Sequence, residues 1–177
     1  MDQTFERLYD NYHSNLFQFI FYMVKNRAVA EELVQEVYIN VLRSYDNYEE
    51  RSNEKTWLFA IARNVAIDYL RTYNRRTTRW LSKFDFNKQQ TKDLAPLPEE
   101  ILLQKEEVQA IYHCLKSCTI DQQEVLILRY IQELSINETA EILNWSVSKV
   151  KTTQHRALKA LRELADDQMK NQLKGVL

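Results

Sequence analysis

The sequence has almost no glycine and little proline. Its one glycine is Gly175, where average usage over 177 residues gives about 12, and its two prolines are Pro96 and Pro98. Because β-hairpins need turn residues with positive φ, this shortage argues against a β-rich fold. No apolar run approaches the roughly 18 residues of a membrane span, and the start, MDQTFERLYDNY, is acidic rather than signal-like. The chain is therefore expected to be all-α and cytoplasmic.

Cysteine is also scarce. Cys114 and Cys118 lie four residues apart beside His113, on one face of a predicted helix. These three residues would supply part of a metal site or a redox pair, but their spacing matches no common zinc motif. The other interpretation is two reduced thiols that act as small apolar side chains. We therefore expect no metal, cofactor or catalytic residue, and keep an enzyme or metalloprotein built on this group as an alternative.

The total charge is nearly balanced, with 24 Lys and Arg against 25 Asp and Glu. This balance excludes a uniformly basic nucleic-acid-binding protein. The charge is nevertheless distributed in blocks: residues 74–93 carry six basic and two acidic groups, and residues 135–177 carry seven and five. Local basic surfaces are therefore expected.

Apolar periodicity predicts helices over residues 2–25, 28–45 and 54–73. From Asn74 to about Pro98 the periodicity stops, and helical patterning returns from Glu99. The predicted architecture is two small helical domains, residues 1–73 and 99–172, joined by a flexible linker, residues 74–98. A linker of this length extends at most roughly 80 Å, so the domains are expected to reach two separated sites at once. Asp121 with Glu124 resembles a capping box at the start of a helix in the second domain.

Residues 135–165 have the plan of a helix-turn-helix. Ser135 can cap a short helix, INETAEIL, and Asn144-Trp145 forms a tight connection. Ser146 then caps a second helix over residues 147–165, which has an apolar stripe on one side. This arrangement of two helices and a short turn is typical of DNA-binding domains.

The second of these helices is basic on its outer side. Residues 144–162 contain no acidic residue, in a chain that is about one-seventh acidic. Lys and Arg would neutralise phosphates, and Arg156 would donate two hydrogen bonds to a guanine edge. The simpler interpretation is an amphipathic helix with a solvated basic side. The predicted DNA-contacting residues, opposite or beside the apolar stripe, are Ser148, Lys149, Lys151, Thr152, His155 and Arg156.

Three segments, in this order, carry a resemblance to a known family. They are EELVQEVYINVL (31–42), EKTWLFAIARNVAIDYLR (54–71) and VLILRYIQELSINETAEILNWSVSKVKTTQHRALKALR (125–162). The chain resembles a bacterial sigma factor of the extracytoplasmic-function (ECF) type, within the sigma-70 family. The resemblance implies a region 2 that docks on RNA polymerase and melts and reads the −10 element, and a region 4 that reads the −35 element.

The resemblance also implies site residues. The residues implied for polymerase binding lie away from the apolar face of their helix and are Glu32, Gln35, Glu36 and Ile39. The residues implied for reading the −10 strand are Tyr48, Arg63, Asn64, Ile67 and Arg71. Of these, Tyr48 is expected to be exposed and to stack on an unpaired base. One position departs from the pattern: Glu54 stands where the family often has an aromatic residue, so no base contact is expected from it.

The implied partners are core RNA polymerase, promoter DNA and an anti-sigma factor, which in this family is often membrane-anchored, and no small-molecule substrate is expected. The predicted function is that of a promoter-specificity subunit without catalytic chemistry. A free-standing helix-turn-helix repressor, which would bind DNA without polymerase, is the alternative.

Overall fold

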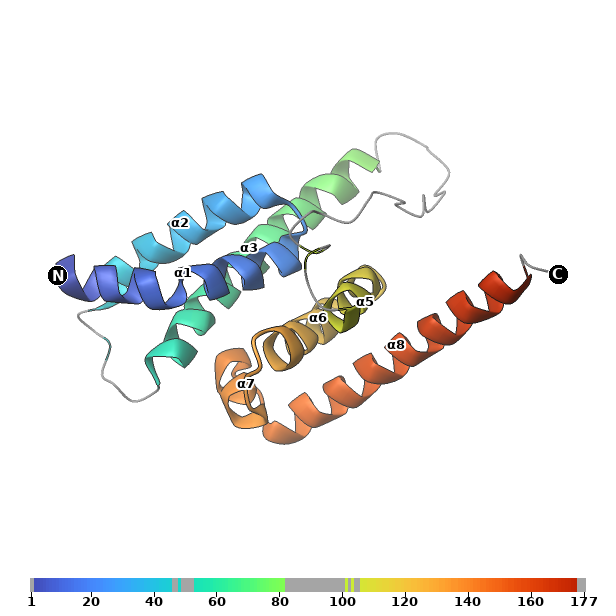
Figure 1. The fold of residues 1–177 in the computed structure, drawn as a ribbon. Coiled ribbons are helices and arrows are strands. Elements are labelled where there is room, and N and C mark those ends of the chain that lie inside the picture. The colour runs from blue at the N-terminus through green and yellow to red at the C-terminus, as the bar shows by residue number, and fades with distance from the viewer. Residues whose placement is uncertain are drawn as a thin grey trace.

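The structure is a computed structural model that describes residues 2–45, 48, 53–81, 101, 103 and 106–174. Figure 1 shows two groups of helices. The first group contains α1 (Asp2–Val24), α2 (Arg27–Ser44) and α3 (Glu54–Leu81), and the second contains α5 (Glu106–Leu115), α6 (Ile120–Leu126), the π-helix η2 (Ile127–Ile131), α7 (Ile136–Leu143) and α8 (Val147–Lys174). No strand occurs within the described ranges, so the predicted all-α class is confirmed. Of the described helices, none combines the length and apolar character that crossing a bilayer requires.

The first three helices form a bundle around an apolar core. On α2 the predicted apolar face is confirmed, because Ala30, Leu33, Val34, Val37 and Val41 are all buried. Asn26 caps this helix by accepting a hydrogen bond from the backbone N–H of Val29 at 3.1 Å. The bundle therefore follows from the 3.6-residue periodicity of its sequence.

The third helix is longer than predicted, because it continues past residue 73 to Leu81. Residues 71–77 are all exposed. Their polar sequence ends the apolar periodicity without ending the helix, since no glycine or proline occurs before Pro96. Polarity at this point indicates a solvated helix, and α3 includes residues 74–81 of the predicted linker. Residues 82–98 of that linker lie outside the described residues.

The start of α6 also differs from the prediction. Thr119 accepts a hydrogen bond from the N–H of Gln122, and the side chain of Gln122 accepts one from the N–H of Thr119. The capping box is therefore formed by Thr119 and Gln122, and not by Asp121 and Glu124. Glu124 lies inside the helix and is fully buried.

With so little glycine, other residues occupy the left-handed backbone positions. Among the described residues these are Lys25, Glu133 and Asn144, with φ of 57°, 54° and 53°. Asn tolerates this conformation well, whereas Lys and Glu do so at a higher energetic cost. Each residue follows the last turn of a helix, where a left-handed residue satisfies open carbonyl groups.

The two groups of helices pack against each other. Helix α3 lies against α7, and α1 lies against η2. Their buried apolar side chains form one cluster that includes residues of both halves. In the described arrangement the halves are thus in direct contact, whereas the sequence predicted separated domains on a tether.

Candidate nucleic-acid interface

The helix-turn-helix is built by local capping. Ser135 and Glu138 form a capping box at the start of α7, as Ser135 was predicted to do. Asn144 ends that helix in the left-handed conformation, with its N–H bonded to the carbonyl oxygens of Ala140 and Glu141. Ser146 then accepts a hydrogen bond from the N–H of Lys149 at 3.2 Å and so caps α8. The predicted turn is confirmed.

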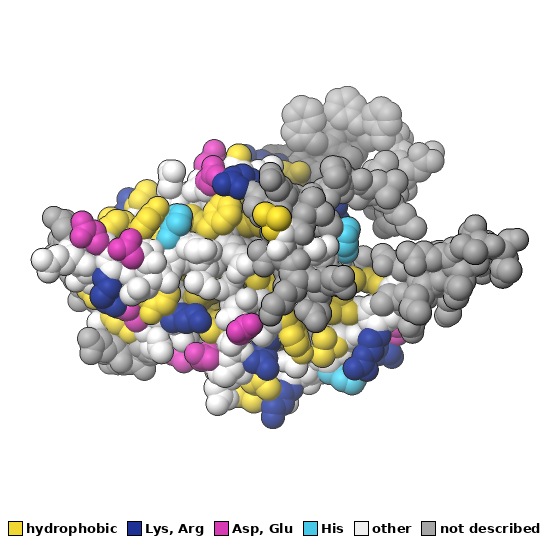
Figure 2. Space-filling view, in the orientation of Figure 1, with side chains coloured by type: hydrophobic (Ala, Val, Ile, Leu, Met, Phe, Trp, Pro, Cys, Tyr) yellow, Lys and Arg dark blue, Asp and Glu magenta, His cyan; other side chains and the backbone are white. Residues whose placement is uncertain are grey.

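The outer side of α8 is exposed and basic. Val150 and Ala157 are fully buried and fix which side of the helix faces the core. Lys and Arg side chains lie along the lower edge of Figure 2, where Figure 1 places α8. All six predicted DNA-contacting residues are exposed: Ser148, Lys149, Lys151, Thr152, His155 and Arg156.

Lys149 already has two partners within the chain. Its Nζ lies 3.5 Å from the centre of the Trp145 ring and 3.6 Å from Oδ2 of Asp121. The cation–π contact orients the side chain, while the half-exposed ion pair contributes little to stability. Lys149 would have to exchange Asp121 for a phosphate group in order to bind DNA.

A hydrogen-bond chain connects α8 to η2. Nε of Arg129 donates to Oε1 of Gln154 at 3.1 Å, and Nε2 of Gln154 donates to the hydroxyl oxygen of Tyr130 at 3.1 Å. Arg129 also donates to the carbonyl oxygen of Leu134. These bonds fix the orientation of α8 relative to the π-helical segment.

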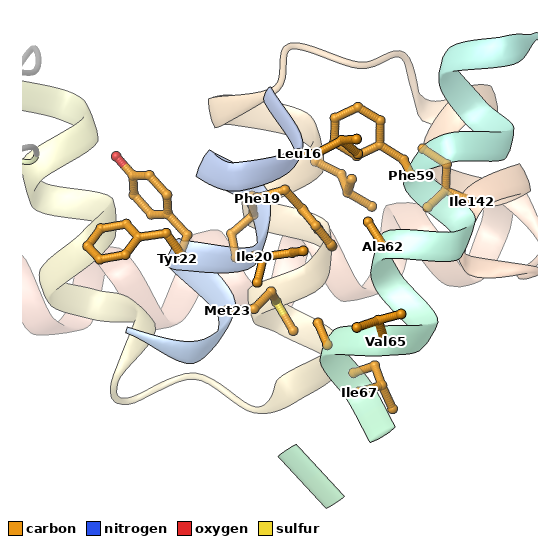
Figure 3. Packing of buried hydrophobic residues seen from close by; sticks show 14 of the residues in the cluster. Leu16, Phe19, Ile20, Tyr22, Met23, Phe59, Ala62, Val65, Ile67 and Ile142 are labelled. Atoms are coloured by element: carbon orange, nitrogen blue, oxygen red, sulfur yellow. The ribbon is translucent and has the colours of Figure 1, made fainter. Parts of the chain in front are cut away.

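The residues of α3 that were predicted to contact the −10 strand are only partly accessible. Asn64 is exposed, and Arg71 is exposed with Nη1 3.9 Å from Oδ1 of Asp68. Ile67, which Figure 3 shows among the packed side chains of α3, is only 5% exposed. In this arrangement Ile67 is therefore not accessible together with Asn64 and Arg71, and its predicted contact with the −10 strand would require it to be uncovered.

Arg63 is bound to the other half of the chain. Its Nε lies 2.6 Å from Oε1 of Glu124, whose side chain is fully buried. Burial raises the pKa of the Glu124 carboxyl, while the hydrogen bond and charge of Arg63 act in the opposite direction. Oε2 of Glu124 accepts no hydrogen bond from the described residues. Arg63 therefore neutralises a buried carboxylate and is not available to a ligand here.

Further polar contacts cross between the halves. Nζ of Lys25 donates to Oε1 of Gln123 at 2.8 Å, and burial lowers the pKa of Lys25 to about 8. The side chain of Gln132 accepts from Asn15 and donates to Gln18. Apolar packing adds to these bonds: in Figure 3 Ile142 of α7 lies next to Phe59 of α3.

Tyr48 belongs to an aromatic cluster. Its ring centre lies 4.7 Å from that of Trp57 and 6.2 Å from that of Tyr45. Tyr48 is consequently half-buried, and the expectation of an exposed side chain is wrong. Trp57 is also half-buried, so both residues keep part of their surface accessible.

The predicted polymerase-binding residues lie on the outer side of α2. Glu32, Gln35 and Glu36 are exposed, and Ile39 is 48% exposed. Leu42, one turn further along, is 44% exposed and extends the apolar part of this surface. An exposed apolar pair surrounded by acidic and amide groups has the composition of a protein-binding patch.

His113, Cys114 and Cys118 differ in how far they are buried. Cys118 is buried, Cys114 is half-buried and His113 is exposed. Burial raises the pKa of both thiols, which lowers their reactivity. Within the described residues no three His, Cys, Asp or Glu side chains are placed to hold a metal ion.

Comparison with known proteins shows the family to which the chain belongs. Residues 8–77 match the family model of sigma-70 region 2, and residues 108–161 match that of sigma-70 region 4. The chain is 52% identical to the ECF RNA polymerase sigma factor SigX of Bacillus subtilis (strain 168), over 96% of this chain and 92% of that protein. The chain belongs to the ECF sigma-factor family. The RNA polymerase sigma factor YlaC of the same organism is 31% identical, over 90% of this chain and 91% of that protein.

Solved structures agree with the fold of this sigma factor. The sigma factor RpoE from Bartonella quintana, in complex with the anti-sigma factor NepR, matches with a TM-score of 0.74 at 24% identity, over 93% of this chain and 98% of that chain. CnrH, in complex with the cytosolic domain of CnrY, matches with a TM-score of 0.69 at 21% identity, over 94% and 90%. At these identities the likeness concerns the fold alone.

The family boundaries show what the contact between the halves connects. In this sigma factor Lys25 and Arg63 belong to the region 2 match, and Gln123 and Glu124 to the region 4 match. Sequence reasoning did not find these pairs, because their members are 98 and 61 residues apart. One local feature could have indicated the pair of Arg63 and Glu124: Glu124 is a charged residue directly before the apolar run Val125–Leu128.

Proposed function

We propose that this sigma factor directs core RNA polymerase to promoters through their −35 and −10 elements and helps to open the duplex. The supporting observation is the similarity over nearly the whole chain to an ECF sigma factor, together with region 2 and region 4 matches in that order. A free-standing repressor would need only the helix-turn-helix and gives no reason for the region 2 match. In this function the chain carries no catalytic residue and needs no cofactor or small-molecule substrate, and it works in the cytoplasm.

The −35 element is assigned to the outer side of α8. The support is its exposure and its lack of acidic side chains between residues 144 and 162. Lys151 and Lys149 would bind phosphates, and Arg156 would read a base edge in the major groove. Ser148, Thr152 and His155 are short or planar donors that permit a close approach to the groove.

The −10 element is assigned to α3 and the adjacent aromatic cluster. Asn64 and Arg71 are exposed, and the accessible part of Tyr48 offers a stacking surface for an unpaired base. Arg63 and Ile67 are covered in the described arrangement, so their contribution requires that region 4 first moves away from α3.

Two protein partners are proposed. Core polymerase would bind the patch of Glu32, Gln35, Glu36 and Ile39 on α2. An anti-sigma factor is the second partner. The support comes from the two solved structures of similar fold, in which RpoE is in complex with the anti-sigma factor NepR and CnrH with the cytosolic domain of CnrY.

The test is reconstitution with core polymerase on a promoter that carries both elements. We expect the chain to add promoter-directed initiation to core polymerase, and the variant Glu32→Lys/Glu36→Lys to lose most of its polymerase affinity, by roughly tenfold or more. Glu6→Lys, at an exposed glutamate of α1, is the matched control and should bind normally. Tight binding of the isolated chain to promoter DNA without any gain in initiation would instead identify a repressor.

A further inference from the structure

A side chain of α1 binds the first residue of α3, close to the aromatic cluster of Tyr48 and Trp57. Tyr45 directly follows α2, and Glu54 is the first residue of α3. Nη1 of Arg7 donates to Oε2 of Glu54 at 2.8 Å, and Nη2 donates to Oε1 at 2.6 Å. The Glu54 carboxylate raises the pKa of the Arg7 guanidinium, and Tyr45 contributes to this shift in the same direction. Arg7 thus forms a two-bond ion pair with the first residue of α3.

This ion pair has the geometry that fixes orientation. Two parallel N–H···O bonds between a guanidinium and a carboxylate set both the distance and the angle between the two groups. The Glu54 side chain is 19% exposed and that of Arg7 is 49% exposed. An ion pair with this exposure contributes little to the stability of the fold, so its main effect is on local geometry.

The geometry that is fixed includes the aromatic cluster. Trp57 lies one turn after Glu54 on α3, and its backbone N–H donates to the carbonyl oxygen of Asn53 at 3.0 Å. The Tyr48 ring packs on Trp57, and the N–H of Tyr48 donates to the carbonyl oxygen of Tyr45 at 2.9 Å. A rotation of the first turn of α3 would therefore move Trp57 and with it the surface against which Tyr48 lies.

We propose that Arg7 and Glu54 form a positioning pair that holds Tyr48 and Trp57 in the arrangement that receives an unpaired −10 base. The proposal rests on the proposed function, since it assumes that this cluster meets the melted strand. Glu54 occupies the position at which the resemblance to the family led us to expect an aromatic residue. In this chain that position supports the stacking surface from behind through Arg7, and does not itself meet the base.

The test measures promoter opening by polymerase that carries the full chain with Arg7→Ala, Glu54→Ala or both. Permanganate reactivity against time gives the opening rate, and binding at low temperature gives the affinity of the closed complex. We expect each single variant to open roughly fivefold to tenfold more slowly, a part of the stacking energy of one base. The affinity of the closed complex and the melting temperature should not change, and the double variant should be no slower than either single variant.

Two further variants separate orientation from simple charge. The exchange Arg7→Glu/Glu54→Arg keeps an ion pair at the same place and should recover a large part of the opening rate. Glu6→Ala removes an exposed carboxylate of α1, at the residue directly before Arg7. It is the matched control and should open promoters at the normal rate.

The outcomes are distinguishable from failure of the proposed function. If Tyr48→Ala slows opening while Arg7→Ala and Glu54→Ala open normally, the positioning pair is refuted and the −10 role of the cluster stands. If the Arg7 and Glu54 variants lose closed-complex affinity or melting temperature in parallel with opening, the pair is structural and the proposal is also refuted. Normal opening by Tyr48→Ala removes the cluster from −10 reading altogether, while promoter-directed initiation still tests the sigma-factor function separately.

Discussion

The two surfaces assigned to DNA differ in how open they are. On α8 the basic side chains face solvent, whereas on α3 Arg63 is bound to the buried carboxylate of Glu124 and Ile67 is covered. In the proposed assignment, a −35 element would therefore meet α8 without separation of the two regions, and Lys149 would only exchange its partner Asp121. A −10 strand would contact Arg63 and Ile67 of α3 only after regions 2 and 4 separate.

The contact between the two regions has a composition that suits a reversible interface. It contains a buried carboxylate, a lysine whose pKa is lowered by burial, and the amide group of Gln132 with its two partners. Charged groups withdrawn from water recover hydration when the interface opens, which offsets part of the lost packing. The difference between the two proposed DNA surfaces thus depends in part on a small number of polar pairs that can be changed one at a time.

The largest effect on this difference is expected from Arg63→Met. The change leaves Glu124 buried without its counter-ion, which costs about 3 kcal/mol in the closed arrangement, or roughly a hundredfold in the ratio of closed to open chain. Dyes attached to α2 and α8 should report a longer distance at neutral pH. Because burial raises the pKa of Glu124, the closed form binds a proton more tightly than the open form, so acidification should close the variant again.

The matched control for this experiment is the double variant Arg63→Met/Glu124→Leu. It replaces both charges by apolar groups of similar size, which is often neutral or stabilising for a buried pair. It should therefore remain closed at all pH values. A dye distance in Arg63→Met equal to that of the parent chain would show that the ion pair does not hold the halves together.

A smaller effect is expected from Arg156→Ala on the open surface. Loss of a base-reading contact should weaken binding to the −35 element by about 1–3 kcal/mol. Initiation at promoters that depend on this element should fall accordingly. The distance between the dyes should stay unchanged, because Arg156 is exposed and lies outside the contact between the regions. Arg162→Ala, at an exposed arginine of the same helix, is the control. An equal loss in both variants would mean that α8 contributes only general positive charge.

The smallest expected effect concerns Lys25. Its pKa is about 8 in the closed chain against an ordinary value of 10.5, so the open chain binds more protons between these pH values. The closed arrangement should therefore become more stable as the pH rises from 8 to 10.5, while below pH 8 the full cost of the buried charge remains. The gain should be on the order of 1 kcal/mol, since the ammonium group is not fully enclosed.

Titration of the dye distance from pH 7 to pH 10.5 measures this dependence. Lys25→Met should abolish it, and Lys55→Met, at a half-buried lysine of α3, should retain it. A pH dependence that survives in Lys25→Met would assign the titration to another group.

Local patterns predicted the helix-turn-helix well. Ser135, Asn144 and Ser146 act within four residues of their own positions, so their roles can be read from the sequence. The exposure of the basic side of α8 also follows from its helical period. Region 2 was predicted equally well where the apolar face of α2 decided the burial.

Contacts between distant residues were not predictable in this way. Arg63 was predicted to contact the −10 strand, but Glu124, the group that binds it, is 61 residues away in the sequence. Arg7 and Glu54, 47 residues apart, carry no local signal of their pairing. Tyr48 was expected to be exposed because its neighbours in sequence are polar, whereas its burial depends on Trp57 in the next helix.

The π-helical segment Ile127–Ile131 is connected by hydrogen bonds both to region 2 and to helix α8. Through Gln132, directly after it, the segment reaches Asn15 and Gln18 of region 2, and through Arg129 it reaches Gln154 of the reading helix α8. An energetic coupling carried by this segment obeys linkage and is therefore reciprocal. If separation of the regions changes the affinity of α8 for a −35 element by some factor, binding of that element changes the separation equilibrium by the same factor. The promoter sequence would then act as an effector of the sigma factor's own conformation.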